Sequence, residues 1–352
     1  MKKRCIIASI LLVAIIALCT GIEVKKNTFT DQRVATRWSE DRMEQISIFY
    51  PVTRNALLDS MGFEDFSHRI QSALDKSAYA TAGITDEKGI SFPYAVSVTG
   101  KVSMEYNGKI TDTAAMGVEQ RFFTFHPVDL IYGAYLSAND LMDDGIVIDD
   151  VTAWNLFGAS DVVGKSVNIG GVPHYIRGVF RKEDSRVAGA AGLDKAMCLV
   201  SLSSMNKYGN VQGSYCYEVI LPDPVDDFAN NIIGELLGDD VKELDVVDNT
   251  HRYTMGACLG KLGQVGLRSM STKGIVYPYF ENEARAWEDL LAIWYGILAV
   301  VIVMLIICIF CIYISFRRTS HYKRLKKFFR PKAPWKWKIW SYLERKNKEE
   351  IL

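Results

Sequence analysis

The chain has 352 residues, and its 41 basic and 41 acidic side chains give a formal net charge of zero. This total combines two opposed parts, because residues 317–352 carry a net charge of +10, residues 2–4 carry +3, and the rest therefore carries about −13. The basic residues lie beside apolar runs, which is typical of a membrane protein and argues against nucleic-acid binding.

Two uncharged runs, residues 5–22 and 290–316, are candidates for membrane spans. A spanning helix needs about 20 apolar residues, so the second run predicts a transmembrane helix and the first is just long enough. Basic flanks stay on the cytoplasmic side, so both termini are expected inside a cell membrane crossed twice. The predicted order is a cytoplasmic N-terminus, a first span, an extracytoplasmic domain, a second span and a basic, Trp-rich cytoplasmic tail, over residues 1–4, 5–22, 23–289, 290–316 and 317–352.

The first run has a second interpretation as a cleaved signal peptide, because it has a basic start and an apolar middle. Cys19 is not the usual small residue at a cleavage site, and Leu18 is not the small residue expected before a lipoprotein cysteine. A retained anchor is therefore favoured, with cleavage as the alternative.

The first half of the outer segment predicts one helix and three strands. Residues 43–50 favour a strand, and residues 64–77 favour an amphipathic helix, because apolar side chains recur there at helical spacing. Residues 94–106 and 110–118 favour two strands joined by a turn at Asn107-Gly108, a strong hairpin signal.

The middle of the segment predicts a strand, a helix and a second hairpin. Residues 146–149 favour a buried strand, after which Asp150 is the expected N-cap of a helix that ends at Gly158. Residues 165–169 and 172–181 favour a hairpin that turns at Gly170-Gly171.

The last part of the segment predicts a strand–helix–strand unit over residues 215–221, 225–237 and 241–247. Residues 280–290 are polar, acidic and compatible with a helix. We expect this helix to continue into the second apolar run as one long helix.

Signals for catalysis, cofactors and metals are absent from the spacing of the residues. Gly158 to Ser166 resembles a phosphate-binding loop but has five residues, not four, before the Gly164-Lys165 pair. The acidic cluster around Asp144 does not fit a calcium loop, and the five histidines show no paired metal spacing. We therefore predict no catalytic, cofactor-binding or metal-binding residue.

Three cysteines, Cys198, Cys216 and Cys258, lie in the outer segment. Cys198 and Cys216 fall on neighbouring predicted strands, so a disulfide between them is one interpretation. Three buried thiols are the other.

An ordered set of residues between positions 121 and 181 resembles the extracytoplasmic core domain of MacB-type ABC transporter permeases, a family related to the FtsX and LolC/LolE proteins. The set consists of a glycine, a Leu-Ser and an acidic residue, a short strand, a helix ending Leu-Phe-Gly, an acidic residue, a Val-Gly-Lys and a closing Gly-Val strand. These positions are Gly133, Leu136-Ser137, Asp140, residues 146–148, Leu156-Phe157-Gly158, Asp161, Val163-Gly164-Lys165 and Gly178-Val179. Each of these residues has a structural interpretation in turns and strands, and none is assigned chemistry.

The resemblance implies an α+β outer domain of two lobes, one built from βαβ units near the membrane and one inserted and rich in β-strands. It also implies an ATPase in the cytoplasm whose cycle moves the outer domain through the membrane helices. A MacB-type permease has four spans, whereas this chain shows two. The chain is then either half of a permease, completed by a second permease-like chain, or a derivative that no longer couples to ATP.

The tail places Trp335, Trp337 and Trp340 among lysines and arginines. This mixture favours a helix that lies on an anionic membrane surface. By analogy with the family, the same segment is alternatively a contact for the ATPase.

The favoured function is a membrane subunit, without catalytic activity or cofactor, of an ABC-type export or mechanotransmission complex. Its expected partners are a separate ABC ATPase, a second permease-like chain, the lipid bilayer and an extracytoplasmic protein or peptide. The alternatives are an ATP-independent surface receptor or sensor with the same outer fold and, less favoured, a surface hydrolase. A resemblance of fold predicts architecture more strongly than function.

Overall fold

The computed structural model describes residues 2–77, 89–137, 142–182, 185–193, 196–271 and 273–318. The chain forms two compact units, one of residues Met1–Gly21 and Ile297–Leu352 and the other of residues Ile22–Gly296.

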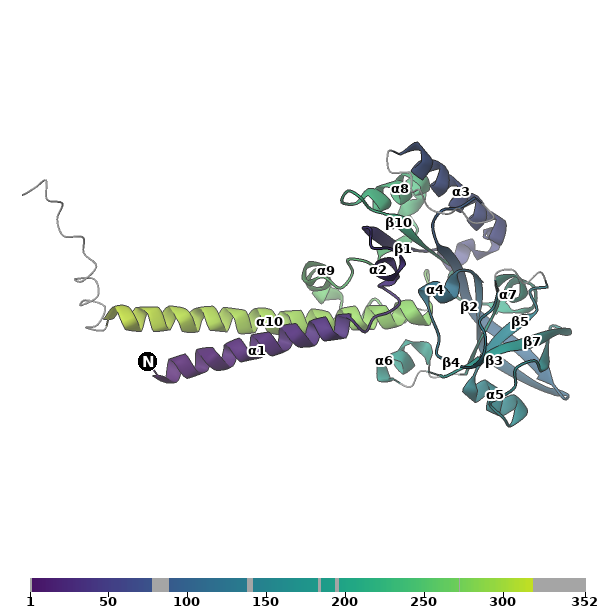
Figure 1. Cartoon of the computed structure of the whole chain (residues 1–352), viewed down its shortest axis with the longest axis horizontal. Helices are drawn as coiled ribbons and strands as arrows, with labels where there is room; N and C mark the ends of the chain where they lie inside the picture. Colours follow the sequence, from purple (N-terminus) through teal and green to yellow (C-terminus); the bar gives the residue numbers. More distant parts are fainter. Residues whose placement is uncertain are drawn as a thin grey trace, which may run out of the picture. The chain divides into compact units, whose positions relative to one another are not determined.

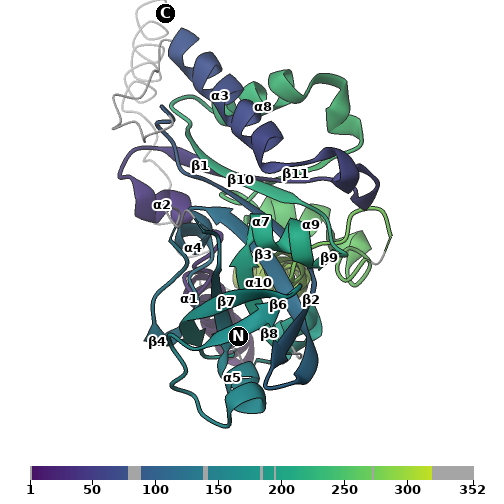
Figure 2. The same ribbon diagram turned by 90° about the vertical axis from the view of Figure 1, so that its right-hand side faces the viewer.

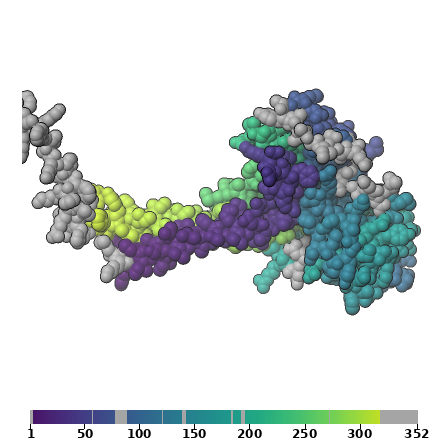
Figure 3. Space-filling model, viewed as in Figure 1, coloured from purple at the N-terminus to yellow at the C-terminus, as the bar shows by residue number. Residues whose placement is uncertain are grey.

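The first unit contains most of helix α1 (Lys2–Lys26) and the later part of helix α10 (Tyr279–Arg318). Both helices are long and apolar enough to cross a membrane, by length and composition. In this unit they pack side by side, as Figures 1 and 3 show, and Arg4 Nη1 donates to the Cys311 carbonyl over 3.3 Å. The start of α1 therefore meets the late turns of α10, and the expected single helix beginning near residue 280 is confirmed.

The second unit is built on one sheet of eleven strands, whose order is β11-β1-β10-β2-β3-β8-β5-β7-β4, with β6 and β9 off this path (Figure 2). The strands are β1 (Met43–Phe49), β2 (Tyr94–Tyr106), β3 (Lys109–Gln120), β4 (Leu130–Gly133), β5 (Gly145–Asp149), β6 (Ser166–Ile169), β7 (Val172–Phe180), β8 (Met197–Ser201), β9 (Asn210–Val211), β10 (Cys216–Pro222) and β11 (Asp245–Asp248).

The helices of this unit pack around the sheet. They are α2 (Val34–Trp38), α3 (Ser60–Lys76), α4 (Phe122–Phe125), α5 (Asp150–Phe157), α6 (Arg186–Ala188), α7 (Leu202–Tyr208), α8 (Phe228–Leu237) and α9 (Met255–Gly260), with shorter turns at η1 (Val52–Leu57), η2 (Gly189–Leu193), η3 (Gly238–Lys242) and η4 (Leu262–Gln264).

Two interleaved βαβ units form one part of the sheet. Strand β10 is antiparallel to both β1 and β2, so β1-α3-β2 is a parallel pair with β10 between its strands. Strand β1 likewise separates β10 and β11 in the unit β10-α8-β11. Helices α3 and α8 lie next to each other on one face of these strands (Figure 2). Their buried side chains, which include Phe63, Ile70 and Ile233, belong to one apolar cluster with Ile46 and Ile48 of β1.

The other strands continue the same sheet from the β2–β3 hairpin. Asn107 and Gly108 have φ of 49° and 75°, as a two-residue hairpin turn with positive φ at both positions requires, so this prediction is confirmed. The expected hairpin at Gly170-Gly171 is present between β6 and β7. Because one sheet runs through both sets of strands, the division into two lobes stays a prediction.

Two local expectations were wrong. The N-cap of α5 is Asp149, not Asp150, because Asp149 Oδ1 accepts the Thr152 N–H at 2.6 Å while Oδ2 accepts the Met197 N–H at 2.9 Å. Strand β11 begins at Asp245 and not at residue 241, because residues Gly238–Lys242 form a 3-10 helix.

The structure also decides between the two interpretations of the outer cysteines. Cys198 and Cys216 are free thiols, on strands β8 and β10 that are separated in the sheet by β2 and β3. A disulfide across neighbouring strands is therefore ruled out, and the alternative of three buried thiols describes Cys198, Cys216 and Cys258.

Candidate functional site

The first turns of α10 carry a row of charged side chains into the protein interior. Glu281, Arg285, Glu288 and Asp289 recur at the spacing of one helix face and are exposed by only 1–8%. Burying charges is costly unless each charge is paired and hydrogen-bonded. Their partners therefore decide what this face does.

Arg252, in the turn after β11, is the central partner. Its Nε donates to Glu288 Oε1 over 2.7 Å, and its Nη1 and Nη2 donate to the two oxygens of Glu281 at 2.8 and 3.0 Å. Nη1 also donates to Asn249 Oδ1 over 2.7 Å. The two-point contact with Glu281 fixes the orientation of the guanidinium as well as its charge.

Further basic side chains complete the pairing of Glu288 and Asp289. Lys261 Nζ donates to Glu288 Oε1 over 3.0 Å, and Arg268 Nη1 lies 2.7 Å from Glu288 Oε2. Asp289 accepts from Arg268 Nη2 at 3.0 Å and from the Gly266 N–H at 2.7 Å. Two irregular segments after β11 are thereby attached to α10.

Arg285 connects the helix to β11. Its Nε donates to Glu281 Oε1 over 2.6 Å, its Nη2 pairs with Asp245, and its guanidinium lies 3.8 Å from the centre of the Tyr277 ring. The Tyr277 hydroxyl also donates to Asp245, over 2.9 Å. We call the eight charged residues the α10 charge cluster: Asp245, Arg252, Lys261, Arg268, Glu281, Arg285, Glu288 and Asp289.

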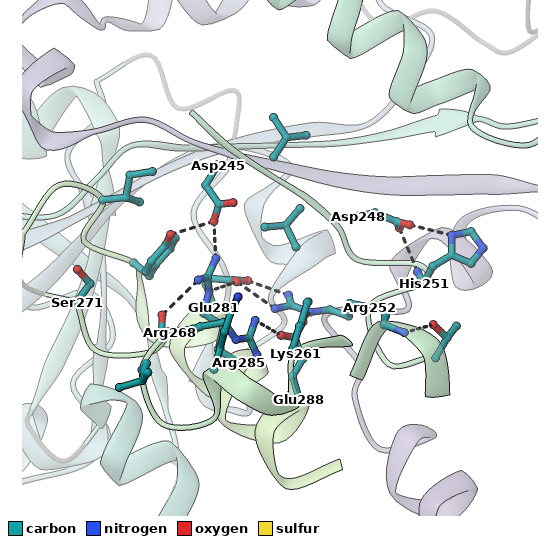
Figure 4. A pocket seen from close by; sticks show the side chains of 18 of the residues that line it. Asp245, Asp248, His251, Arg252, Lys261, Arg268, Ser271, Glu281, Arg285 and Glu288 are labelled. Carbon is teal, nitrogen blue, oxygen red and sulfur yellow. Dashed lines mark hydrogen bonds and ion pairs between the residues drawn. The ribbon is translucent and has the colours of Figure 1, made fainter. Parts of the chain in front are cut away.

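The α10 charge cluster holds four positive and four negative side chains, and all of them except Asp289 line a cavity of about 760 Å³ (Figure 4). Burial alone lowers the pKa of Arg252, but Glu281 and Glu288 outweigh burial and raise the pKa further above its usual range. All four carboxylates of the α10 charge cluster have cationic partners. The cluster therefore attaches helix α10 to the sheet. It does not resemble a pair of catalytic acid and base groups.

A second buried network surrounds His126, which follows α4. Its Nδ1 lies 2.8 Å from Asp31 Oδ2 and its Nε2 lies 2.5 Å from Glu218 Oε2. Burial alone lowers the pKa of His126, but Glu218 and Asp31 outweigh burial and raise the pKa to about 10. The imidazole stacks on Phe280 of α10 with ring centres 3.7 Å apart. This network joins the segment after α1, strand β10 and the first turn of α10.

One group of side chains in the described part of the chain could hold a metal ion. Glu44, Asp248 and His251 offer ligand atoms within 4.8 Å of one another. They come from β1, β11 and the turn after β11, so no local sequence motif for a metal site predicts this group.

Gly133, one of the residues chosen from the sequence, ends β4 in a conformation that only glycine fits. Its φ is 79°, and an added Cβ would lie 2.1 Å from the Arg177 carbonyl oxygen of β7. Gly133 pairs with Gly178 in the β4–β7 ladder. Its place indicates close backbone packing and not ligand binding.

The other chosen residues in the described part gather around the end of α5 and the β6–β7 hairpin. Leu156 is buried, and Gly158 ends α5 with φ of 66°. Phe157 contacts Tyr106 at 4.3 Å between ring centres, and the Lys165 ammonium lies 5.2 Å from the Phe157 ring. The Gly164 N–H donates to the Ile176 carbonyl over 2.9 Å. Asp140, Trp335, Trp337 and Trp340 lie outside the described residues.

Sequence reasoning missed both buried networks. The acidic, helical character of residues 280–290 was a visible signal for the α10 charge cluster. Its partners Arg252, Lys261 and Arg268 lie in irregular segments, where no periodicity marks a buried charge. His126 had no local signal, because its partners lie 95 and 92 residues away.

Residues 6–231 match the family described as the MacB-like periplasmic core domain. No curated protein matches the chain. Among solved structures, the periplasmic region of MacB from Actinobacillus actinomycetemcomitans is similar at 15% identity and a TM-score of 0.38, over 58% of this chain and 88% of that one.

Two further structures are similar at 17% identity. The extracellular domain of the noncanonic ABC-type transporter YknZ from Gram-positive bacteria has a TM-score of 0.36, over 58% of this chain and 99% of its own. A domain of a putative permease protein from Porphyromonas gingivalis has a TM-score of 0.34, over 70% and 97% of the two chains.

Proposed function

Because the chain belongs to the family of proteins with a MacB-like periplasmic core domain, we propose that it is a non-catalytic membrane subunit of an ABC-type export or mechanotransmission complex. The family match over residues 6–231 is the observation that carries this proposal. Helix α10 supports it, because one unbroken helix runs from the buried charge cluster to Arg318.

The proposed subunit crosses the cell membrane twice, with its core domain outside and both termini in the cytoplasm. Two helices of spanning length and composition support the two crossings. The contact of Arg4 with Cys311, between the start of one helix and the late turns of the other, supports a common side for both ends. Basic residues at positions 2–4 and 317–318 favour the cytoplasm as that side.

The proposed energy source is an ABC ATPase on a separate chain, and a second permease-like chain completes the membrane part. The outer domain contacts an extracytoplasmic protein or peptide. In this scheme the interleaved βαβ units form the lobe near the membrane, and the strands that follow the β2–β3 hairpin form an inserted lobe. Gly133, Leu156, Phe157, Gly158, Gly164 and Lys165 have structural roles in the inserted lobe, and the same role is proposed for Asp140.

The test is recovery of the tagged protein in mild detergent from its native membrane, followed by identification of the chains that co-purify. We expect an ABC ATPase and a second permease-like chain. Recovery of folded protein without any ATPase, after crosslinking in intact cells as well, would contradict the proposal and favour an ATP-independent receptor.

The tail provides a matched variant for the same experiment. We propose that Trp335, Trp337 and Trp340 attach the tail to the membrane surface or to the ATPase. Replacing all three with alanine should release the tail to protease. Loss of ATPase recovery as well would identify a contact with the ATPase, and retained ATPase with a released tail would identify the membrane. Unchanged protection would contradict both roles.

A further inference from the structure

Three potential metal ligands are brought together at the edge of the sheet by strand pairing. Asp248 of β11 is the pairing partner of Ile46 of β1, and Glu44 lies two residues before Ile46 on the same face. His251 follows in the next turn, where its backbone N–H donates to Asp248 Oδ1 over 3.1 Å. Its Nδ1 lies 2.9 Å from Asp248 Oδ2 and 3.7 Å from Glu44 Oε1.

Glu44 is only 2% exposed, and its carboxylate has one satisfied oxygen. Oε1 accepts from Asn230 Nδ2 over 2.7 Å, whereas Oε2 is buried without a hydrogen-bond partner within the described ranges. A buried polar atom without a partner is rare and costly. This oxygen marks a place where a cation would be stabilised.

The electrostatics around Glu44 also favour a positive ligand. Burial and the neighbouring carboxylates of Asp248 and Asp223 raise the pKa of Glu44 to about 7, against the lowering effect of His251. Arg42 lies near Glu44 but forms its ion pairs with other residues. It pairs with Asp223 at 3.0 Å and with Asp226 at 2.6 Å. A cation bound beside Glu44 would offset the repulsion among these carboxylates.

We propose that Glu44, Asp248 and His251 form a site for a divalent transition-metal ion, with Zn²⁺ as the first candidate. One oxygen from each carboxylate and Nδ1 of the imidazole supply three ligands. In tetrahedral geometry with bonds of 2.0–2.2 Å, ligand atoms lie about 3.4 Å apart. His251 Nδ1 lies 2.9 Å from Asp248 Oδ2 and 3.7 Å from Glu44 Oε1, and the three ligand atoms all lie within 4.8 Å of one another. An imidazole with two carboxylates suits Zn²⁺ better than Ca²⁺, which takes six to eight oxygens.

The exposure of His251 gives the site an open side. Its side chain is 53% exposed, so a fourth ligand comes from water or from a residue of a bound partner. The ion would join β1 to the turn that carries Arg252. Binding should therefore raise the melting temperature of the protein.

The test is calorimetric titration of the purified full chain, without a polyhistidine tag and after chelator treatment, with ZnCl₂. We expect one saturable site. His251→Ala and Glu44→Gln should each weaken binding about 10- to 100-fold and remove the rise in melting temperature. His251 is exposed, so His251→Ala keeps the fold and remains informative if Glu44→Gln does not fold.

The matched control is His68→Ala, because His68 is an exposed histidine on α3 outside the site. It should bind Zn²⁺ as the wild type does. The proposal is overturned if His251→Ala also binds as the wild type does, or if CaCl₂ raises the melting temperature as much as ZnCl₂.

Discussion

Arg252 holds two buried carboxylates, Glu281 and Glu288, through three hydrogen bonds. Replacing it with methionine keeps most of the volume and removes the charge. Because buried carboxylates without their partner are strongly destabilising, Arg252→Met should cost about 3 kcal/mol of unfolding free energy. We expect the melting temperature of the full chain in detergent to fall by about 10 °C.

Arg181→Met is the matched control for this change. Arg181 pairs with Asp129 at 3.1 Å, but both side chains are about two-thirds exposed. Exposed ion pairs contribute about 0–1 kcal/mol, so the melting temperature should stay within a few degrees. Equal effects of the two variants would show that the α10 charge cluster does not fasten the helix.

Substitution of Gly133 tests the close approach of strands β4 and β7. An added Cβ would lie 2.1 Å from the backbone carbonyl of Arg177, and the φ of 79° is unfavourable for alanine. Gly133→Ala should therefore destabilise the protein by about 2–3 kcal/mol, measured by chemical denaturation.

Gly234→Ala is its control, because Gly234 lies inside α8 with no atom within 4 Å of an added Cβ. Alanine in a helix interior is favourable, so this variant should gain up to about 1 kcal/mol. If the two changes had the same sign, the close approach of β4 and β7 would not explain Gly133.

The buried charge of His126 predicts that the stability of the protein depends on pH. The pKa of His126 is about 10 in the folded protein and about 6.5 when unfolded, so protonation stabilises the folded state. This contribution is complete below pH 6.5 and is lost as the pH rises through about 10. The melting temperature should fall steadily between pH 6.5 and 10.

His126→Gln should flatten this profile and cost about 3 kcal/mol near pH 6, where Glu218 would lose its buried cation. His68→Gln should leave the profile unchanged, because His68 is exposed. Parallel profiles for wild type and His126→Gln would contradict a charged, buried His126.

The sequence predicted those elements whose signals are local. The period of apolar residues indicated α3, and Asn107-Gly108 indicated the β2–β3 hairpin. The order of the strands was beyond local signals, because β1 pairs with β10 and β11 from the far end of the domain. The question of a disulfide stayed open for the same reason, since Cys198 and Cys216 lie close in sequence but not in the sheet.

The candidate sites were less predictable than the fold. A charged face at residues 280–290 was visible, but nothing in the sequence says whether such a face is solvated or buried. The charged face of α10 can be buried because Arg252 and Arg268 pair with its carboxylates. These two residues reach α10 only after the chain has folded. Glu44, Asp248 and His251 meet for the same reason, through strand pairing across two hundred residues.

At the scale of the whole molecule, the proposed topology predicts which positions face the outside. Glu105→Cys introduces an exposed thiol on β2, and Lys338→Cys introduces a thiol into the tail sequence. A membrane-impermeant maleimide should label Glu105→Cys in intact cells and Lys338→Cys only after permeabilisation.

The wild type is the control. Cys198, Cys216 and Cys258 are buried and burial raises their pKa values, and the other four cysteines lie in the two proposed membrane spans. We expect the wild type to remain unlabelled in intact cells. Labelling of Lys338→Cys without permeabilisation would contradict cytoplasmic termini.

The position of β1 between β10 and β11 also affects the newly made chain during synthesis. Ser47 of β1 hydrogen-bonds to Glu218 of β10, which is made 171 residues later. Protein synthesis proceeds at about 5–20 residues per second. Strand β1 is therefore made about 10–30 s before β10, and longer before β11. During that wait both of its edges are open to pairing with other chains. The nascent protein is therefore exposed to wrong strand pairing for tens of seconds, until β10 and β11 have been synthesised.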